Sequence, residues 1–193
     1  MAKKLVQGKG VNDYEGNIKG NDCELKCYNI WRGVLRRCYS EKFYKTNPTY
    51  KGCSVCEDWL LYSNFRKWFS DNYRWDLDKM GIKLELDKDL LVEGNKMYSP
   101  ETCVFLPRLV NSFLSINYKN NISGVTGVSW DKNSRKWKSQ ISKGDGHNTY
   151  LGLFNNIEDA KVSYKLARHN RALEVQEYMR KLNYIESVVE KIR

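Results

Sequence analysis

The stretch Lys83-Leu-Glu-Leu-Asp-Lys-Asp-Leu-Leu-Val-Glu-Gly-Asn-Lys-Met-Tyr-Ser-Pro-Glu-Thr-Cys-Val-Phe-Leu-Pro107 organises the N-terminal half of the chain. From residue 82 to 87 apolar residues alternate with charged ones, which is the periodicity of a strand with one buried face. A polar loop with Gly and Pro follows, and residues 102–106 form a second apolar run. The pattern predicts a β-hairpin with two carboxylates, Asp87 and Asp89, at the end of its first strand.

The rest of the chain predicts an α+β protein in two parts. Residues 1–22 are polar and lack periodicity, so we expect a flexible N-terminal arm. Residues 23–116 hold helices near 25–39 and 64–73, the hairpin, and a helix that begins at Pro107. A polar linker is expected at 117–123. A three-stranded sheet and a helix follow over 124–173, with strands at 124–130, 136–142 and 148–154, and a last amphipathic helix over 174–193.

Charge and aromatic content favour a nucleic-acid partner. The formal net charge is +10, and aromatic residues make up 13% of the chain. Residues 119–172 carry 10 basic and 4 acidic residues, a net charge of +6, so more than half of the excess lies in about a quarter of the chain. A localised basic segment attracts phosphates, and aromatic rings stack on bases. We expect double-stranded DNA; the alternative is a basic protein that binds no nucleic acid.

The cysteines favour a structural zinc site. All six precede residue 104, and no apolar run has the length of a membrane span or of a signal-peptide core. We therefore expect no membrane partner and a reducing, cytoplasmic location, in the host cytoplasm or nucleoid if a phage encodes the protein. Cys53-Ser-Val-Cys56 has the spacing of a zinc knuckle, and Cys38 and Cys103 complete a four-thiolate set. Cys23 and Cys27 are a competing pair, and the alternative is that the cysteines are small buried apolar residues.

The two hairpin carboxylates predict a second kind of metal site. Asp87 and Asp89 are two residues apart on one strand, so their side chains share a face. Oxygen-rich sites hold Mg²⁺ or Mn²⁺, and such an ion can polarise a phosphodiester and stabilise its leaving oxygen. The alternative is a strand end with two solvated acids.

Residues 28–115 resemble an HNH-type family of phages and mobile elements. The motifs that carry the resemblance are Trp31-Arg-Gly-Val-Leu-Arg-Arg-Cys-Tyr39, Tyr50-Lys-Gly-Cys-Ser-Val-Cys-Glu-Asp-Trp59, Asn64-Phe65, Trp68, Leu86-Asp-Lys-Asp89, Gly94-Asn-Lys96 and Tyr98-Ser-Pro-Glu-Thr-Cys103. The resemblance implies a ββα-metal hairpin, here stapled by zinc, and the activity of a metal-dependent DNA endonuclease, often a homing enzyme.

The same resemblance implies roles for five residues. Asp87 and Asn111 would hold one divalent ion, Mg²⁺ or Mn²⁺, and Asp89 would position the water. Asn95 matches the loop residue of the family in kind. Lys88 stands where the family has a histidine general base, and a lysine serves as a base near neutral pH only if its pKa is strongly lowered.

Residues 123–172 resemble the APETALA2/ERF DNA-binding domain. The motifs are Gly124-Val-Thr-Gly-Val-Ser-Trp130, Lys136-Trp-Lys-Ser-Gln-Ile141, Leu151-Gly-Leu-Phe154, Glu158-Asp-Ala160 and Tyr164-Lys-Leu-Ala167. The resemblance implies an antiparallel three-stranded sheet that packs on one helix and enters the DNA major groove. Ser129 and Ser142 stand where the plant domains usually carry arginine, so the sequence specificity is expected to differ.

Strand alternation separates the two faces of this sheet. The side chains expected against the helix are Val128, Trp137, Ser139, Ile141, Leu151 and Phe154, packed on Ala160, Tyr164 and Ala167. The side chains expected to face DNA are Ser129, Lys132, Arg135, Lys136, Lys138, Gln140, Lys143 and Tyr150. The alternative is a solvated polar face that contacts no partner.

Two open questions concern catalysis and oligomeric state. The first hypothesis is a homing-type endonuclease that its sheet domain targets to DNA. The second is a catalytically inactive DNA-binding protein, a regulator or interference factor, and the third is a protein–protein inhibitor on the same scaffold. The apolar stripe of the last helix packs on its own domain or, alternatively, forms a dimer: Val175, Tyr178, Met179, Leu182, Ile185, Val189 and Ile192.

Overall fold

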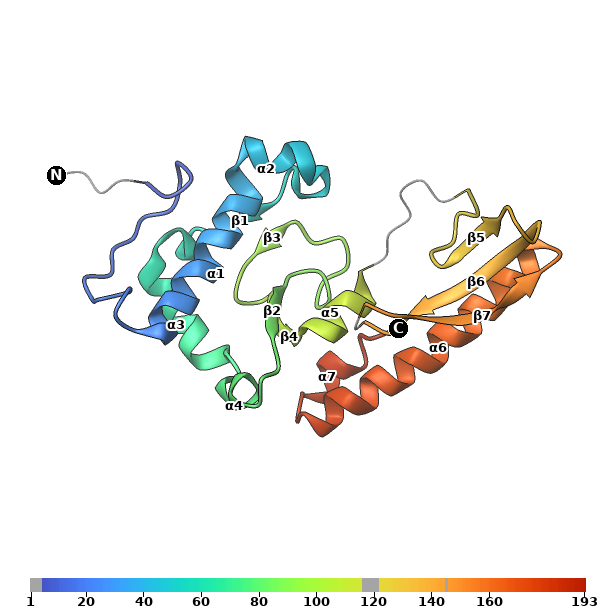
Figure 1. Cartoon of the computed structure of the whole chain (residues 1–193). Helices are drawn as coiled ribbons and strands as arrows, with labels where there is room; N and C mark the ends of the chain where they lie inside the picture. Colours follow the sequence, from blue (N-terminus) through green and yellow to red (C-terminus); the bar gives the residue numbers. More distant parts are fainter. Residues whose placement is uncertain (1–4, 116–121, 145) are drawn as a thin grey trace. The chain divides into compact units, whose positions relative to one another are not determined.

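The computed structural model describes residues 5–115, 122–144 and 146–193. It divides into two compact units, Met1–Phe105 and Leu106–Arg193, each described here by itself (Figure 1). The boundary therefore falls inside the strand that ends the predicted hairpin, earlier than the linker expected at 117–123. Most of that linker lies outside the described residues. The secondary structure is α+β, as predicted.

Unit 1 is mainly helical. Its long helix α1 (Asp22–Tyr39) begins where the Asn21 side chain accepts hydrogen bonds from the backbone N–H groups of Cys23 and Glu24, at 2.9 and 3.2 Å. It ends at Ser40, whose hydroxyl caps the next helix. The other elements are α2 (Glu41–Thr46), η1 (Pro48–Tyr50), β1 (Ser54–Val55), η2 (Asp58–Leu60), α3 (Tyr62–Asn72), α4 (Trp75–Lys79), β2 (Leu84–Asp87) and β3 (Met97–Tyr98).

The predicted hairpin is present with one added pairing. Strand β2 pairs with β4 (Val104–Pro107), and β3, inside the intervening loop, pairs in parallel with β1. The pairs Ser54–Met97 and Val55–Tyr98 thus join the Cys53–Cys56 segment to the loop of the hairpin. The helix α5 (Arg108–Leu114) follows in unit 2, with Pro107 as its N-cap and last strand residue, rather than as its first helical residue as predicted.

Aromatic side chains fill the core of unit 1. Trp31, Tyr62 and Phe65 have no exposed surface, and Trp59 is 1% exposed. The indole N–H of Trp31 donates to the Trp59 carbonyl at 2.7 Å, so the buried polar atom of this large ring is satisfied. The rings of Trp31 and Tyr62 lie 5.2 Å apart. This cluster joins α1 to α3.

The N-terminal segment packs on this core, in contrast to the flexible arm that its composition predicted. Val11 forms a parallel bridge with Leu61, and its N–H donates to the Leu60 carbonyl at 2.8 Å. The Asp13 carboxylate accepts a hydrogen bond from the backbone N–H of Ser63 at 2.9 Å, in the first turn of α3. Because no flanking side chain caps α3, Asp13 serves that purpose from a distant part of the chain.

Unit 2 contains the predicted antiparallel sheet and helix. Its strands are β5 (Val128–Asp131), β6 (Lys136–Ser142) and β7 (Asn148–Phe154), in the order β5-β6-β7. Figure 1 shows the long helix α6 (Ile157–Lys181) running beside them. Strand β5 starts four residues later than predicted, because Gly124 and Gly127 adopt φ of +69° and +80° and place the preceding chain in turns.

The helices of the C-terminal region are divided differently from the prediction. One continuous α6 replaces the two helices expected on either side of residue 173, and a short α7 (Glu186–Val189) follows. Four members of the predicted stripe are buried within the unit, namely Val175, Met179, Val189 and Ile192. The stripe therefore packs on its own domain, which accounts for it without a dimer.

The centre of the sheet predicts a stabilising substitution. Ser139 has no exposed surface, and among the described residues its hydroxyl is a buried polar group without a hydrogen-bond partner. An unsatisfied buried hydroxyl costs about 1–3 kcal/mol. We expect Ser139→Ala to raise the free energy of unfolding of unit 2 by about 1 kcal/mol, measured by hydrogen exchange of the β6 amides. Thr149→Ala, a partly exposed hydroxyl in β7, is the control, and a Ser139→Ala variant less stable than wild type would contradict this reading.

Candidate functional site

The sheet of unit 2 has one buried face and one accessible face. Val128 and Ala160 are completely buried, and Tyr164 is 7% exposed. The partly buried side chains of Trp137, Ile141 and Phe154 pack against this cluster. Leu151 and Ala167 are partly buried. The predicted assignment of the helix-facing side is therefore confirmed for Val128, Trp137, Ile141 and Phe154 with Ala160 and Tyr164, and Ser139 is buried as well.

None of the eight side chains predicted to face DNA is buried. Those that are exposed are Ser129, Lys132, Arg135, Lys143 and Tyr150, and those that are partly exposed are Lys136, Lys138 and Gln140. Lys138 pairs with Ser129 on one side and with Leu153 on the other. Gln140 pairs with Tyr150. The central strand thus carries a cation and an amide in adjacent positions on one surface.

A bulge in β6 and β7 sets the partner of Gln140. The register shifts between Ser139 and Gln140, so Ser139 pairs with Gly152 and Gln140 pairs with Tyr150, and Leu151 has no partner in the ladder. An extra residue of this kind re-aims the side chains that follow it. Tyr150 is 59% exposed as a result of its place on the open side. Alternation alone does not reveal this shift, because the bulge depends on how two strands meet.

One exposed apolar side chain, Leu153, extends the surface beyond the predicted set, and a second, Trp130, is exposed near the end of β5 on the helix-facing side. Trp130 is 45% exposed and meets Trp137 edge to face, with ring centroids 5.3 Å apart. Leu153 is 38% exposed and lies opposite Lys138. The alternation places Trp130 on the helix side with Val128, and only its position near the end of the strand leaves it open. Flat and apolar groups next to cations are the combination that single bases and thymine methyl groups contact.

The hairpin in unit 1 holds Asp87 in a tight turn. Its Oδ1 accepts hydrogen bonds from the backbone N–H groups of Asp89 and Leu90, at 3.0 and 2.7 Å. The side chain is partly buried. Burial raises the pKa of the Asp87 carboxyl, and the two N–H bonds oppose that rise. Both described hydrogen bonds of Asp87 use one carboxylate oxygen and shape the end of the strand.

Lys88 and Asn95 close the loop that follows. Lys88 is 6% exposed, and its ammonium group donates to the Asp89 carboxylate and, at 2.9 Å, to the Asn95 carbonyl. The Asn95 amide donates in return to the Lys88 carbonyl at 2.7 Å and to the Met97 carbonyl at 2.6 Å. Through these hydrogen bonds Lys88 and Asn95 hold the two ends of the loop together, which is a structural role. They also bring four of the five predicted catalytic residues together.

The fifth predicted catalytic residue belongs to the other unit. Asn111 lies on α5 in unit 2, whereas Asp87 lies on β2 in unit 1. The two predicted ligands of the divalent ion therefore lie in different units, and each unit is described by itself. Carboxylate and amide oxygens remain a chemically suitable pair for Mg²⁺ or Mn²⁺.

Three of the four predicted zinc ligands meet in the core of unit 1. Cys38, Cys53 and Cys103 are 2%, 5% and 5% exposed, and Cys56 is partly buried. Burial, with a further contribution from the neighbouring Cys53, raises the pKa of the Cys38 thiol to about 12. Burial likewise raises the pKa of Cys103 to about 12. Without a metal these two side chains are neutral thiols near pH 7.

The described residues do not gather these thiols into a complete set of metal ligands. Across residues 5–115, 122–144 and 146–193, no group of three or more His, Cys, Asp or Glu side chains has the geometry to hold a metal ion. Four sulfur donors have the right chemistry for tetrahedral zinc. The zinc site stays a prediction, and Cys23, which is exposed, does not join Cys27 in the core.

In the part of the chain that the structure describes, no helix is long and apolar enough to cross a membrane. Comparison with protein-family models, with curated proteins and with solved structures finds no match to this chain.

Proposed function

We propose that the protein binds double-stranded DNA through the open face of the β5-β6-β7 sheet. The observation that carries the proposal is the juxtaposition of Lys138, Gln140 and Tyr150 on that face, opposite the side packed on α6. A lysine neutralises phosphate or contacts guanine, and glutamine pairs with the edge of adenine. The resemblance of residues 123–172 to the APETALA2/ERF domain supports the same surface.

A triple variant of this face tests DNA binding. We expect Lys138→Ala/Gln140→Ala/Tyr150→Ala to weaken binding to duplex DNA at least about tenfold, because one lost base contact alone costs about 1–3 kcal/mol. The slope of log affinity against log salt should fall by about 1 for the lost phosphate contact. Fluorescence anisotropy over a series of salt concentrations measures both quantities.

The matched control removes charge from the opposite side of the same unit. Lys165→Ala deletes an exposed cation on α6 and should change the affinity by less than about twofold, through the general field alone. Equal losses in the control and in the triple variant would show that only net charge matters. Full affinity in the triple variant would place the DNA elsewhere, or favour a protein–protein role.

A second candidate function is DNA cleavage at the hairpin. The specific observation in its favour is that Asp87, partly buried at the end of β2, stands beside the closed Lys88–Asn95 loop. A divalent ion held there would polarise the phosphodiester and stabilise the leaving oxygen. Lys88 is engaged with Asp89 and Asn95, so it supports the loop rather than serving as a base. Asp89 is the remaining group that can orient a water.

The substitution Asp87→Asn separates cleavage from folding. An asparagine oxygen can still accept the N–H bonds of Asp89 and Leu90, whereas its charge and its affinity for a hard cation are lost. We expect nicking of supercoiled plasmid with Mg²⁺ or Mn²⁺ to fall at least about 100-fold, with DNA affinity unchanged.

The control for this experiment is Asp71→Asn, which removes an exposed carboxylate from α3. It should leave cleavage unchanged. If the wild-type protein binds DNA and shows no metal-dependent cleavage on any substrate, the protein is a DNA-binding regulator or interference factor and the hairpin serves the fold alone.

A further inference from the structure

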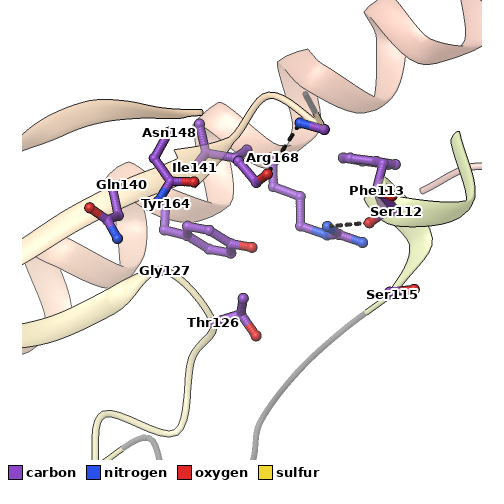
Figure 2. Close-up of a pocket in the computed structure, with 12 residues that line it drawn as sticks. Ser112, Phe113, Ser115, Thr126, Gly127, Gln140, Ile141, Asn148, Tyr164 and Arg168 are labelled. Atoms are coloured by element: carbon purple, nitrogen blue, oxygen red, sulfur yellow. Dashed lines mark hydrogen bonds between the residues drawn. The ribbon is translucent and has the colours of Figure 1, made fainter. Parts of the chain in front are cut away.

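Unit 2 contains a pocket that shares Gln140 with the proposed DNA-binding face and is otherwise lined by other residues. Its volume is about 200 Å³, and its walls come from α5, the turns before β5, the strands β6 and β7, and α6. Figure 2 shows Tyr164 and Arg168 of α6 reaching into the space between the sheet and α5. Pockets that bind drug-sized ligands have volumes of about 300 Å³ or more. The size therefore fits a small group, or one part of a polymer, rather than a whole cofactor.

The hydroxyl of Tyr164 is the first sign of a ligand. The residue is 7% exposed, and its ring packs in the core with Val128 and Ala160. In Figure 2 its hydroxyl end points into the pocket. Among the described residues, no partner accepts or donates a hydrogen bond at this hydroxyl. The hydroxyl is not a buried atom without a partner, so it is open to the pocket and can donate a hydrogen bond to a ligand there.

The guanidinium of Arg168 gives the pocket a positive charge. It donates to the Phe113 carbonyl at 3.3 Å and to the Arg193 carbonyl at 3.4 Å, and it lies 4.4 Å from the centre of the Phe113 ring. Both hydrogen bonds are long for N–H donors. No Asp or Glu side chain pairs with Arg168 in the described part of the chain. The Phe113 ring lies against the guanidinium and holds it in place.

The remaining polar groups of the wall suit the same ligand. Ser112 and Thr126 contribute hydroxyls, and Gln140 and Asn148 contribute amides, whereas the Ser115 hydroxyl donates to the Asn111 carbonyl at 3.0 Å. Among the described lining residues there is one cation and no carboxylate. Hydroxyl and amide donors around a guanidinium match a tetrahedral oxyanion, whose several oxygens each accept hydrogen bonds.

We propose that this pocket binds a phosphoryl group, with Arg168 as its charged ligand and the Tyr164 hydroxyl as a hydrogen-bond donor. The phosphoryl group has two sources with the same chemistry, namely a backbone phosphate of bound DNA and a free phosphate or phosphomonoester. The inference goes beyond binding at the sheet face and does not depend on it, since inorganic phosphate alone probes the pocket.

The test titrates the full chain with inorganic phosphate and with chloride at matched ionic strength. NMR shifts of the Arg168 side-chain N–H and of a Tyr164 ring label report on the site itself. We expect a saturable response to phosphate and none to chloride. Arg168→Gln should weaken phosphate binding at least about tenfold, and Tyr164→Phe, which keeps the buried ring, about three- to tenfold. Arg168→Lys should recover part of the loss.

The control is Arg180→Gln, a cation of the same helix whose partner is Glu186 and which does not line the pocket. It should bind phosphate as wild type does. A response to phosphate that fails to saturate, or that Arg168→Gln leaves unchanged while circular dichroism shows a folded protein, would overturn the proposal.

A competition experiment identifies the source of the phosphoryl group. Short duplex DNA that displaces phosphate from Arg168 indicates that a backbone phosphate occupies the pocket. Phosphate that stays bound in the presence of DNA indicates a free ligand, and both results require the site. A Lys138→Ala/Tyr150→Ala variant, which leaves the pocket-lining Gln140 in place, should lose DNA affinity and keep phosphate binding. The two proposals can therefore fail separately.

Discussion

Replacing Trp31 with alanine is expected to lower the free energy of unfolding of unit 1 by about 3–5 kcal/mol, the range for removing a fully buried large aromatic side chain. Trp31 has no exposed surface and packs against two rings of the core, with ring centroids 5.7 Å from Tyr28 and 5.2 Å from Tyr62. The alanine variant also leaves the Trp59 carbonyl without the indole N–H that donates to it at 2.7 Å. Hydrogen exchange of the α1 and α3 amides in the full chain measures the loss.

The matched control for this experiment is Trp130→Ala. Trp130 is 45% exposed and lies in unit 2, so its removal should leave the exchange of α1 and α3 unchanged. Any loss of stability should be confined to unit 2, where the ring meets Trp137. An effect of Trp31→Ala below about 1 kcal/mol would mean that the aromatic cluster is not the core of unit 1.

Apolar periodicity predicted those helices and strands whose own residues carry a regular pattern. The helices α1 and α3 and the strands β6 and β7 follow from apolar spacing that their own residues carry. The same alternation placed Val128 and Ile141 toward α6 and Lys138 away from it, because side chains of a strand alternate strictly between its faces. These assignments needed no knowledge of the partner elements.

Contacts between distant residues were beyond this reasoning. Asp13 reaches Ser63, fifty residues along the chain, and a capping carboxylate so far from its helix leaves no local signal. The N-terminal segment therefore looked like a flexible arm. The pocket of unit 2 was equally invisible, because Tyr164 matches the spacing of a core residue and Arg168 that of a solvated one.

The continuous α6 shows a different kind of error. Two helices were predicted, although nothing in the sequence ends the first of them near residue 173. No Gly or Pro occurs between Ile157 and Lys181, so nothing ends the helix near residue 173. It ends at Leu182 instead, and Asn183 follows with φ of +56°, a conformation that asparagine tolerates better than most residues.

The lysine at position 88 shows where a family resemblance and the local geometry differ. The motif places Lys88 where the family has its general base, whereas its hydrogen bonds to Asp89 and Asn95 depend on a loop that closes seven residues later. A buried ammonium group needs such partners to offset its desolvation. The sequence shows that position 88 carries a positive charge. The closed loop shows that this charge is paired with the Asp89 carboxylate and the Asn95 carbonyl.

The second large effect is expected at Gly127, where the chain turns between the loop and β5. A Cβ atom built on Gly127 would lie 2.2 Å from the Gln140 carbonyl oxygen and 2.5 Å from the Tyr164 ring. The backbone there has φ of +80°, and the Gly127 carbonyl accepts the Gln140 N–H at 2.9 Å. We expect Gly127→Ala to destabilise unit 2 by about 3 kcal/mol or more, the sum of left-handed strain of about 1–2 kcal/mol and overpacking of about 1–3 kcal/mol.

Gly124→Ala separates these two terms. Gly124 has φ of +69°, so the strain is similar, and a Cβ at that position meets nothing within 4 Å. The control should therefore cost only about 1–2 kcal/mol, measured for both variants by hydrogen exchange of the β6 amides in the full chain. Because Gly127 lies between Gln140 of the sheet face and Tyr164 of the pocket, Gly127→Ala should also weaken both DNA and phosphate binding, whereas Gly124→Ala should spare them. Equal destabilisation by the two substitutions would show that the turn yields to the added methyl group, and that Gly127 does not fix the distance between the sheet and α6.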